Sequence, residues 1–361
     1  MKNCKKIIAL IMSLLLAFGS LSVMSFAAED SVSVNMVNFN VAGLPNVKGI
    51  LGIEDVSVSN NQKVIAEYFN NGNFDIVAVQ EDFNYHDYLA NDLDASYNVR
   101  SNHSGSFLGG DGLNVFTKDI GIYNEKRVPW GRLNGVLDGG ADELSKKGIL
   151  YTVLDLGNGI YVDFYDIHAD AYGTPGDREA REDNFKQLTD LICENSVKYD
   201  RPVIVTGDFN HFFHTTDTNN SHMRQYFLEK CGLKDAWIEA NNGGDYNDFS
   251  KWEKEFADKG GYWGNWESVE KFLYRNGGGV EITIDSCKYT WVKNDKGELV
   301  SDHAANECEM TFTKTADFVA NTQELYVAEP ERNNMFTEMI GFLTILFKLF
   351  ANFDQVLALL G

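Results

Sequence analysis

The sequence has few basic residues for its length. Of 361 residues, 31 are Lys or Arg and 53 are Asp or Glu, which gives a formal net charge of −22 at pH 7. General nucleic-acid binders carry a basic surface, and a strongly acidic chain repels a phosphate backbone, although a metal site can offset this locally. The charge therefore argues against tight nonspecific binding to DNA.

Cysteine is also scarce, and only four of the five cysteines follow the N-terminal leader described below. An even number of cysteines in an exported chain permits disulfides without requiring them. Cys287 and Cys308 fall on what we expect to be neighbouring strands, and they are the first candidates for a pair. Four buried free thiols fit the sequence equally well.

The first residues are typical of an export signal. Lys2, Lys5 and Lys6 precede an apolar run over residues 7–18, and small residues follow at 25–27. The run is shorter than the ~20 residues that a membrane-spanning helix needs, so an uncleaved anchor is the weaker interpretation. We expect residues 1–27 to be a secretion signal and the protein to be secreted or extracellular.

The remaining chain alternates between two kinds of apolar pattern. Short apolar runs bounded by turn residues predict strands, for example at 32–41, 76–79, 149–154, 160–167 and 203–205. Apolar residues that return every three or four positions predict helices, for example at 61–70, 178–193 and 221–231. This alternation indicates a layered α/β architecture. No internal repeat or low-complexity linker interrupts it, and the length permits one large domain or two smaller ones.

The C-terminal stretch, residues 335–360, is densely apolar with a narrow polar stripe. This pattern predicts an amphipathic helix with a wide apolar face. Lys348, Asn352 and Asp354 interrupt the apolar run, which disfavours a helix that spans a membrane. Three placements stay open for this helix: on its own domain, on a membrane surface, or on a partner helix.

The strongest local signal for chemistry is the segment 203–210. An apolar strand is followed there by Gly207, Asp208, Phe209 and Asn210, and strand ends are where open sheets present catalytic groups. Asp208 can take a proton or a metal, and Asn210, two residues on, can point the same way and donate to a phosphate oxygen. The segment alone also fits an ordinary turn, so the neighbouring motifs decide its interpretation.

Other predicted strands also end in polar residues. Asn40 ends the first strand, and Glu81 follows the apolar run 76–79 and is well placed as a ligand for a hard cation. His168 ends the strand at 160–167, and Asp302 and His303 follow Ser301 near the C-terminus. Each motif is weak singly, but together and in this order they are specific.

In this order the motifs resemble the endonuclease/exonuclease/phosphatase superfamily, which includes deoxyribonuclease-I-like nucleases, apurinic endonucleases, neutral sphingomyelinases and inositol polyphosphate phosphatases. The resemblance covers residues 33–313. It implies an α/β fold, a four-layer sandwich of two mixed β-sheets flanked by helices, with the active site at one rim. We therefore expect a catalytic domain at 28–315 and a tail at 316–361 that holds the C-terminal amphipathic helix.

The resemblance also implies a role for each matched residue. Glu81, with Asn40 and Asp302, would hold Mg²⁺, or Mn²⁺ or Ca²⁺ in its place. The remaining residues would be catalytic: Asp208 and Asn210 would position water and phosphate, His168 would stabilise the phosphoryl oxygens, and His303 would be the general acid/base.

The carboxylate that supports His303 is the weakest match. The superfamily supplies it from a strand that reads Ile-Asp-Tyr-Ile or similar, and the nearest segment here is Ile284-Asp285-Ser286-Cys287. We predict Asp285 for this catalytic role. Glu270, in Val269-Glu270-Lys271-Phe272, stays open as a substitute.

This set of residues suits phosphoester hydrolysis, which needs a cation on the phosphoryl oxygens, a positioned water and a proton carrier of near-neutral pKa. Carboxylates and amides suit Mg²⁺ rather than zinc. We predict a secreted, metal-dependent phosphodiesterase or phosphatase. Its acidity and apolar tail favour a phospholipid or phosphorylated headgroup as substrate, with membrane surface contact through 335–360.

Two other functions stay open. One is a secreted nuclease that cleaves DNA or RNA, because members of the superfamily that cut DNA can do so through few cationic contacts. The other is a catalytically inactive membrane- or receptor-binding module on the same fold. Metal-dependent hydrolysis of a phosphodiester separates an enzyme from a binding module.

Overall fold

The computed structural model describes residues 30–44, 56–107, 109–136, 139–214, 222–258 and 267–329, together with 343, 347, 348, 350 and 351. The predicted signal at 1–27 lies outside the described residues, as does most of the predicted C-terminal helix. Both stay predictions.

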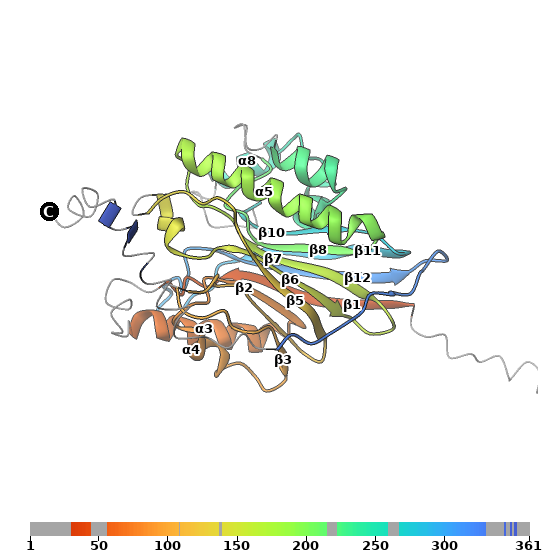
Figure 1. Ribbon diagram of the computed structural model, residues 1–361, viewed down its shortest axis with the longest axis horizontal. Helices are drawn as coiled ribbons and strands as arrows, with labels where there is room; N and C mark the ends of the chain where they lie inside the picture. The colour runs from red at the N-terminus through yellow and green to blue at the C-terminus, as the bar shows by residue number, and fades with distance from the viewer. Residues whose placement is uncertain are drawn as a thin grey trace, which may run out of the picture.

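Two six-stranded mixed sheets pack face to face, and helices cover their outer faces (Figure 1). The first sheet has the order β11 (Val280–Thr290), β12 (Ala305–Lys314), β1 (Ser31–Asn40), β2 (Ile76–Gln80), β4 (Asn114–Thr117) and β3 (Val99–Arg100). The second has the order β5 (Gly121–Pro129), β6 (Gly148–Asp155), β7 (Tyr161–His168), β8 (Val203–Asp208), β10 (Glu270–Arg275) and β9 (Lys234–Asp235). This arrangement confirms the predicted four-layer α/β sandwich.

The helices pack on the two outer faces. Figure 1 shows α3 and α4 on one side of the sandwich and α5 and α8 on the other. The described α-helices are α3 (Val56–Gly72), α4 (His86–Ala90), α5 (Pro175–Asn195), α7 (Ala236–Asn242) and α8 (Ser250–Asp258). Two short 3-10 helices, η1 (Gly139–Leu144) and η2 (Val197–Tyr199), and a π-helix, η3 (Arg224–Lys230), complete the described helices.

The fully buried strand β2 shows why its sequence is a continuous apolar run. Successive side chains of a strand point to opposite faces of the sheet. Ile76 and Ala78 face the core between the two sheets, whereas Val77 and Val79 face the core under α3. A strand that is buried on both faces is apolar at successive positions, not only at alternate ones, and the one polar residue of β2, Gln80, is its last.

Two parallel strand pairs bring the polar residues to one edge of the sandwich. β1 runs parallel to β2, which sets Asn40 opposite Gln80, and β7 runs parallel to β8, which sets His168 opposite Asp208. β10 pairs with β8 in the antiparallel direction and sets Glu270 opposite Asp208. Residues that are far apart in sequence therefore meet where these strands end.

The chain beyond β12 packs on the domain. Phe318 and Leu325 pack against the core between the sheets. The backbone N–H of Asn124 in β5 donates to the carbonyl of Tyr326 at 2.9 Å, and the Asn124 side chain accepts from the N–H of Tyr326 at 2.9 Å. Residues 323–329 thus lie along the outer edge of β5.

The four described cysteines are free thiols. Cys287 and Cys308 lie opposite each other in the β11–β12 pair, on neighbouring strands as expected. The sulfur atoms of Cys193 and Cys231 lie 3.5 Å apart. No helix in the described part of the chain is long and apolar enough to cross a bilayer.

Candidate active site

A cavity of about 440 Å³ opens at the edge where β2, β7 and β8 end. Six of the eight predicted site residues line it: Glu81, His168, Asp208, Asn210, Asp302 and His303. Asn40 lies against them, since its side-chain amide donates to both Glu81 and Asp208. The structure thus brings together seven of the eight residues.

Asn40 is at the centre of this group. Its Nδ2 donates to Glu81 Oε1 and to Asp208 Oδ2, each at 3.1 Å, and lies 3.4 Å from His303 Nε2. Its Oδ1 accepts from the backbone N–H of Ala42, and its carbonyl accepts from the hydroxyl of Ser301. The Asn40 amide therefore fixes the distance between two carboxylates. That of Glu81 follows a strand of the first sheet, and that of Asp208 ends a strand of the second.

Backbone conformation turns two of the side chains into the cavity. Glu81 and Asn210 follow their strands with φ of 59° and 49°, in the left-handed region that few residues other than glycine adopt. Such conformations cluster at functional sites. Gly207 has φ of 131°, and a Cβ there would lie 2.0 Å from the carbonyl oxygen of Ile167. Glycine is needed at this position for the close approach of β8 to β7.

Asp208 and His168 form the buried floor of the cavity. His168 Nε2 lies 3.5 Å from Asp208 Oδ2, and both residues are almost completely buried. Burial, together with the nearby charges of Lys147 and His303, lowers the pKa of His168 well below its usual value, so this imidazole is neutral. Burial also raises the pKa of Asp208.

His303 is held by Glu270. Its Nδ1 is hydrogen-bonded to Glu270 Oε1 and lies 3.7 Å from Asp208 Oδ2. Burial alone would lower the pKa of His303, but the charges of Glu270 and Asp208 raise it well above the usual value. Glu270 is itself fully buried, and its other oxygen accepts from the Ser268 hydroxyl at 2.7 Å. With Nδ1 engaged, Nε2 is the atom of His303 that can exchange protons.

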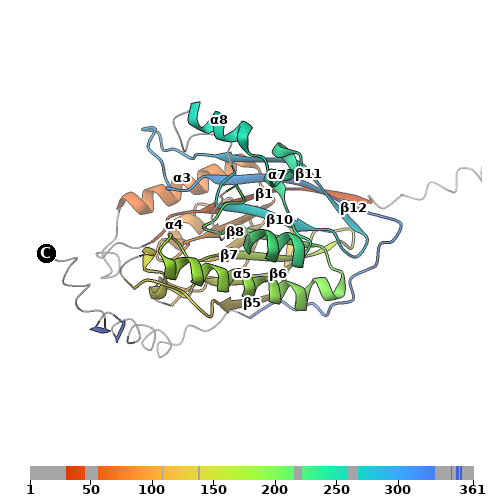
Figure 2. The same ribbon diagram turned by 90° about the horizontal axis from the view of Figure 1, so that it is seen from above.

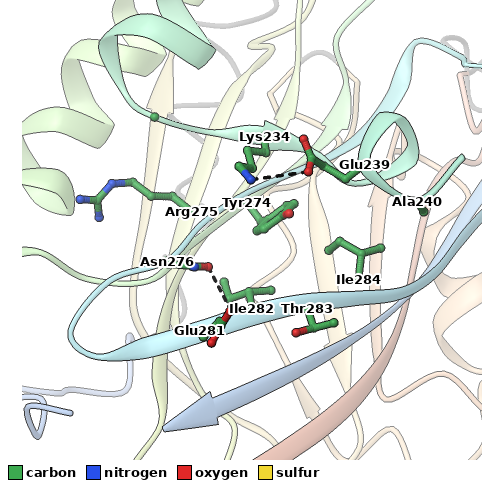
Figure 3. A pocket seen from close by; sticks show the side chains of 11 residues that line it. Lys234, Glu239, Ala240, Tyr274, Arg275, Asn276, Glu281, Ile282, Thr283 and Ile284 are labelled. Carbon is green, nitrogen blue, oxygen red and sulfur yellow. Dashed lines mark hydrogen bonds and ion pairs between the residues drawn. The ribbon is translucent and has the colours of Figure 1, made fainter. Parts of the chain in front are cut away.

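The prediction that Asp285 supports His303 is wrong. Asp285 is exposed on the edge strand β11, at a bulge between Ile284 and Ser286, and it accepts from the Thr311 hydroxyl at 2.6 Å. The adjoining residues of β11 line a different pocket, of about 510 Å³, opposite Lys234 and Glu239 (Figure 3). Glu270, the open substitute, occupies the expected position because β10 pairs with β8.

Asp302 lies at the rim of the cavity. Its side chain is 83% exposed and its Oδ1 is 3.9 Å from His303 Nε2. A carboxylate this exposed is hydrated, so it contributes less to holding a cation than buried Glu81 does.

Lys147 is a residue of the cavity wall that the motifs did not indicate. It comes just before β6, is 8% exposed, and forms an ion pair with Asp142 of η1. Burial would lower the pKa of Lys147, but Asp142 and Glu81 raise it, so the ammonium stays charged. Asp142 in turn accepts from the backbone N–H of Ala171 at 2.7 Å. The only sequence signal is a lysine directly before a strand.

The donor atoms could hold a metal ion in two places. Those of Asp208, Glu270 and His303 lie within 4.8 Å of one another, but Glu270 and His303 are already bonded to each other. The Glu81 carboxylate faces the cavity and, in the described chain, takes its one side-chain hydrogen bond from Asn40. A carboxylate with this much free capacity suits a hard cation.

The comparisons with solved structures define the class of the fold. TDP2 from D. rerio, complexed with a single-stranded DNA product, superposes with a TM-score of 0.54 at 15% identity, over 77% of this chain and 98% of that one. A Bacteroides thetaiotaomicron protein of the endonuclease/exonuclease/phosphatase family superposes with a TM-score of 0.50 at 15% identity, over 81% and 99%. The chain has the fold of the endonuclease/exonuclease/phosphatase superfamily, which confirms the resemblance drawn from its motifs.

Within this fold, sphingomyelinases are similar to the chain in both structure and sequence. Sphingomyelinase C from Streptomyces griseocarneus superposes with a TM-score of 0.51 at 18% identity, over 78% of this chain and 99% of that one. A sphingomyelinase of Mycobacterium tuberculosis is 28% identical over 302 residues, which are 81% of this chain and 55% of that protein. The chain thus spans about half the length of the curated relatives it matches. No family model matches the sequence.

Proposed function

We propose that the protein is a metal-dependent hydrolase of phosphoester bonds and that its substrate is a choline phospholipid such as sphingomyelin. The observation that carries the proposal is the convergence of Glu81, Asp208 and the Glu270–His303 pair in one cavity. A metal ligand, a carboxylate for water and a supported proton carrier are the parts that phosphoester hydrolysis needs.

Glu81 would hold the cation, with Mg²⁺ the first choice, and Asn40 beside it would orient the Glu81 carboxylate. When bound, a divalent cation draws charge from the phosphoryl oxygens. Burial raises the pKa of Glu81, and the charge of Lys147 opposes that rise. A buried carboxylate whose ionised form is this costly gains most from a cation beside it.

The other side chains would orient and transfer protons. Asp208 Oδ1 accepts from the backbone N–H of Asn210 at 2.8 Å, which fixes the carboxylate that would position the attacking water. His303 would gain or lose a proton at Nε2 while Glu270 stabilises the imidazolium form. Lys147, a buried charged group in the cavity wall, would stabilise the negative charge that develops on the phosphoryl oxygens.

The surroundings of the cavity favour a lipid. Leu44, Phe83, Phe107 and Tyr172 line it beside the polar residues, and Tyr172 is 69% exposed. Lys147 is the one Lys or Arg among the lining residues that the structure describes. A cavity with apolar walls and one ammonium fits a headgroup with attached chains better than a polyanion. The named activity of the sphingomyelinase relatives supports the same choice.

We also propose that the protein is secreted and meets its substrate on a membrane surface. Secretion rests on the sequence of residues 1–27. Membrane contact rests on residues 347, 348 and 350, which lie close to the cavity. Lys348 donates to the carbonyl of Glu143 at 2.7 Å, and the neighbouring Asp142 pairs with Lys147 of the cavity wall. Phe347 and Phe350 next to Lys348 are 74% and 69% exposed. Figures 1 and 2 draw the described parts of the segment 343–351 as short dark-blue pieces, at the end of the molecule toward which β1 runs.

A vesicle-binding assay tests the membrane contact. The purified protein is sedimented with sphingomyelin–phosphatidylcholine vesicles, with and without F347E and F350E together. The proposal expects binding that the double variant loses. Val319, 67% exposed, is away from the cavity, and V319E is the matched control that should bind like the wild type. Equal binding by the wild type and the double variant contradicts the contact.

A substrate panel tests the proposed activity. The protein is incubated with sphingomyelin, phosphatidylcholine, plasmid DNA or RNA, each with Mg²⁺ or with chelator. We expect metal-dependent release of phosphocholine, its loss in H303N, and its retention in D285N, which alters an exposed aspartate. Cleavage of nucleic acid alone would make the protein a nuclease, in line with the DNA-bound neighbour TDP2. No cleavage of any substrate would favour a binding module.

A further inference from the structure

A chain of buried polar side chains lies behind the active site, between the two sheets. Gln80 Nε2 donates to Asn38 Oδ1 and to Asp166 Oδ1, each at 2.7 Å. Asn38 Nδ2 donates to the carbonyl oxygen of Gly207 at 3.1 Å. Asn38, Gln80 and Asp166 are completely buried. Three polar side chains in a closed interior require a reason, because burying them is unfavourable unless each is hydrogen-bonded.

Each member of this polar chain lies one or two residues before a residue of the active site. Gln80 precedes Glu81, and Gly207 precedes Asp208. Asn38 and Asp166 come two residues before Asn40 and His168, and thus on the same face of their strands. The polar chain therefore joins β1, β2, β7 and β8 at the level from which the active-site side chains project.

Two oxygen atoms of this polar chain have no hydrogen-bond donor if Asp166 is ionised. Gln80 Oε1 and Asp166 Oδ2 are both buried and accept no hydrogen bond from the described residues. They belong to the two side chains that the Nε2–Oδ1 bond already joins. Asp166 forms no ion pair with a Lys or Arg in the described part of the polypeptide. The charged groups that act on it, Arg127 and Asp111, oppose each other and are themselves an ion pair. An ionised carboxylate there would be both unpaired and partly unsatisfied.

A single proton removes this conflict. A neutral carboxylic acid has an O–H that donates, whereas a carboxylate only accepts. If the proton is on Oδ2, Asp166 can donate to Gln80 Oε1 while its Oδ1 accepts from Gln80 Nε2. Both orphaned oxygens are then satisfied by one bond. Independently, burial raises the pKa of Asp166 well above its usual value.

We infer that Asp166 is a neutral carboxylic acid paired with Gln80 through two hydrogen bonds, and that this pair, continued through Asn38 to Gly207, is a positioning element for Glu81 and Asp208. The positioning role rests on the proposed function, in which Glu81 holds a cation and Asp208 positions water. The protonated acid–amide pair itself does not depend on that function.

A neutral Asp166 matters because of the charges already present in the active site. The cavity and its immediate support already hold five carboxylates against the cations Lys147 and His303; they belong to Glu81, Asp142, Asp208, Glu270 and Asp302. A further negative charge in the layer behind them would raise the cost of ionising Glu81 and Asp208. The acid–amide pair fixes the strands through hydrogen bonds and adds no charge.

Substitutions at Asp166 separate the possible roles. In D166N, the new amide can donate to Gln80 Oε1 and accept from Gln80 Nε2, so the two-bond pair survives without a proton. In D166L, neither bond forms. We expect D166N to keep Mg²⁺ affinity and kcat within about threefold of the wild type, and D166L to lose roughly 10- to 100-fold in Mg²⁺ affinity, as for other residues that orient metal ligands. D285N is the matched control.

Two readouts decide the inference. Calorimetric titration with Mg²⁺ measures the affinity change without turnover, and infrared spectroscopy at pH 7 detects the carbonyl band of a protonated carboxyl group. The inference expects a band in the wild type that is absent from D166N. A wild-type spectrum identical to that of D166N, or a D166N that loses as much Mg²⁺ affinity as D166L, overturns it.

These measurements still test the protonated pair if the proposed function is wrong or if D166L does not fold. If the wild type cleaves no phosphoester, the proposed function fails, whereas the infrared band still tests the protonated pair. If D166L does not fold, as judged by near-ultraviolet circular dichroism, the band and the Mg²⁺ affinity of D166N decide alone.

Discussion

Replacement of Glu270 by glutamine tests how the active site moves protons. The amide of E270Q can still hold the imidazole of His303 in place, but it removes the charge that raises the histidine pKa. Two unit charges about 4 Å apart interact by about 4 kcal/mol at an effective dielectric constant of about 20. The protonated form of the His303 ring loses a stabilisation of this order in the variant. Burial of the imidazole, which opposes protonation, stays unchanged in the variant.

We therefore expect the pKa of His303 to fall in E270Q, because the charge that raises it is gone, and kcat to fall by roughly 10²- to 10⁴-fold, the usual contribution of general acid–base catalysis. The assay is the pH dependence of kcat, with the His303 ring titrated by NMR in the same variant. D285N should reproduce the wild-type profile, because Asp285 contacts Thr311 and not His303. An E270Q profile that overlays that of the wild type, or a shift caused by D285N, refutes the assignment of Glu270.

Three further substitutions follow from the contacts. K147M leaves Asp142 as a buried charge without its ion-pair partner, so we expect the free energy of unfolding in urea to fall by about 3–5 kcal/mol. We also expect kcat/KM to fall by roughly 10²- to 10³-fold. A K147M protein that loses stability but keeps full activity would exclude a role for Lys147 in the reaction. G207A places a methyl group 2.0 Å from the carbonyl oxygen of Ile167 and should cost about 1–3 kcal/mol of unfolding free energy, whereas a wild-type urea midpoint would contradict the close approach. D166N should gain stability relative to the wild type as pH rises. The pKa of Asp166 is higher in the folded than in the unfolded state, so the wild type loses up to about 1.4 kcal/mol per pH unit above pH 4, and D166N does not; a pH-independent difference in urea would contradict this.

The fold and most of the site follow from local patterns. A strand that is buried on both faces is mostly apolar, so a polar residue that ends its apolar run is conspicuous. Asp208, Glu81 and His168 are recognisable in this way, because each comes directly after, or at the end of, a run of buried residues.

The partner of His303 could not be found from local patterns. Asp285 and Glu270 both lie on strands after the Asp208 motif, and the sequence does not state which strand pairs with β8. The antiparallel register that sets Glu270 opposite Asp208 is a long-range feature, and the bulge in β11 turns Asp285 to solvent. Lys147 was missed because it comes from a loop with no repeated pattern.

The polar chain behind the site was hidden for a different reason. Asn38 and Asp166 alternate with apolar residues in their strands, which is also the pattern of a strand with one face in water. Only the second sheet, packed against the first, makes that face an interior. Gln80 ends an apolar run and looks like the first residue of the loop that follows. Residues 323–329 are similar, because their packing depends on the side chain of Asn124 in β5 and not on any periodicity of their own.

The most direct test of the central claim measures hydrolysis of an activated phosphodiester, bis(p-nitrophenyl) phosphate, by the purified protein. The wild type, E81Q and D285N are each assayed with Mg²⁺ and with chelator. The account predicts turnover by the wild type and D285N that needs Mg²⁺, and a loss in E81Q that excess Mg²⁺ partly restores. Turnover that survives the chelator, or that is unchanged in E81Q, would contradict a metal-dependent site at Glu81.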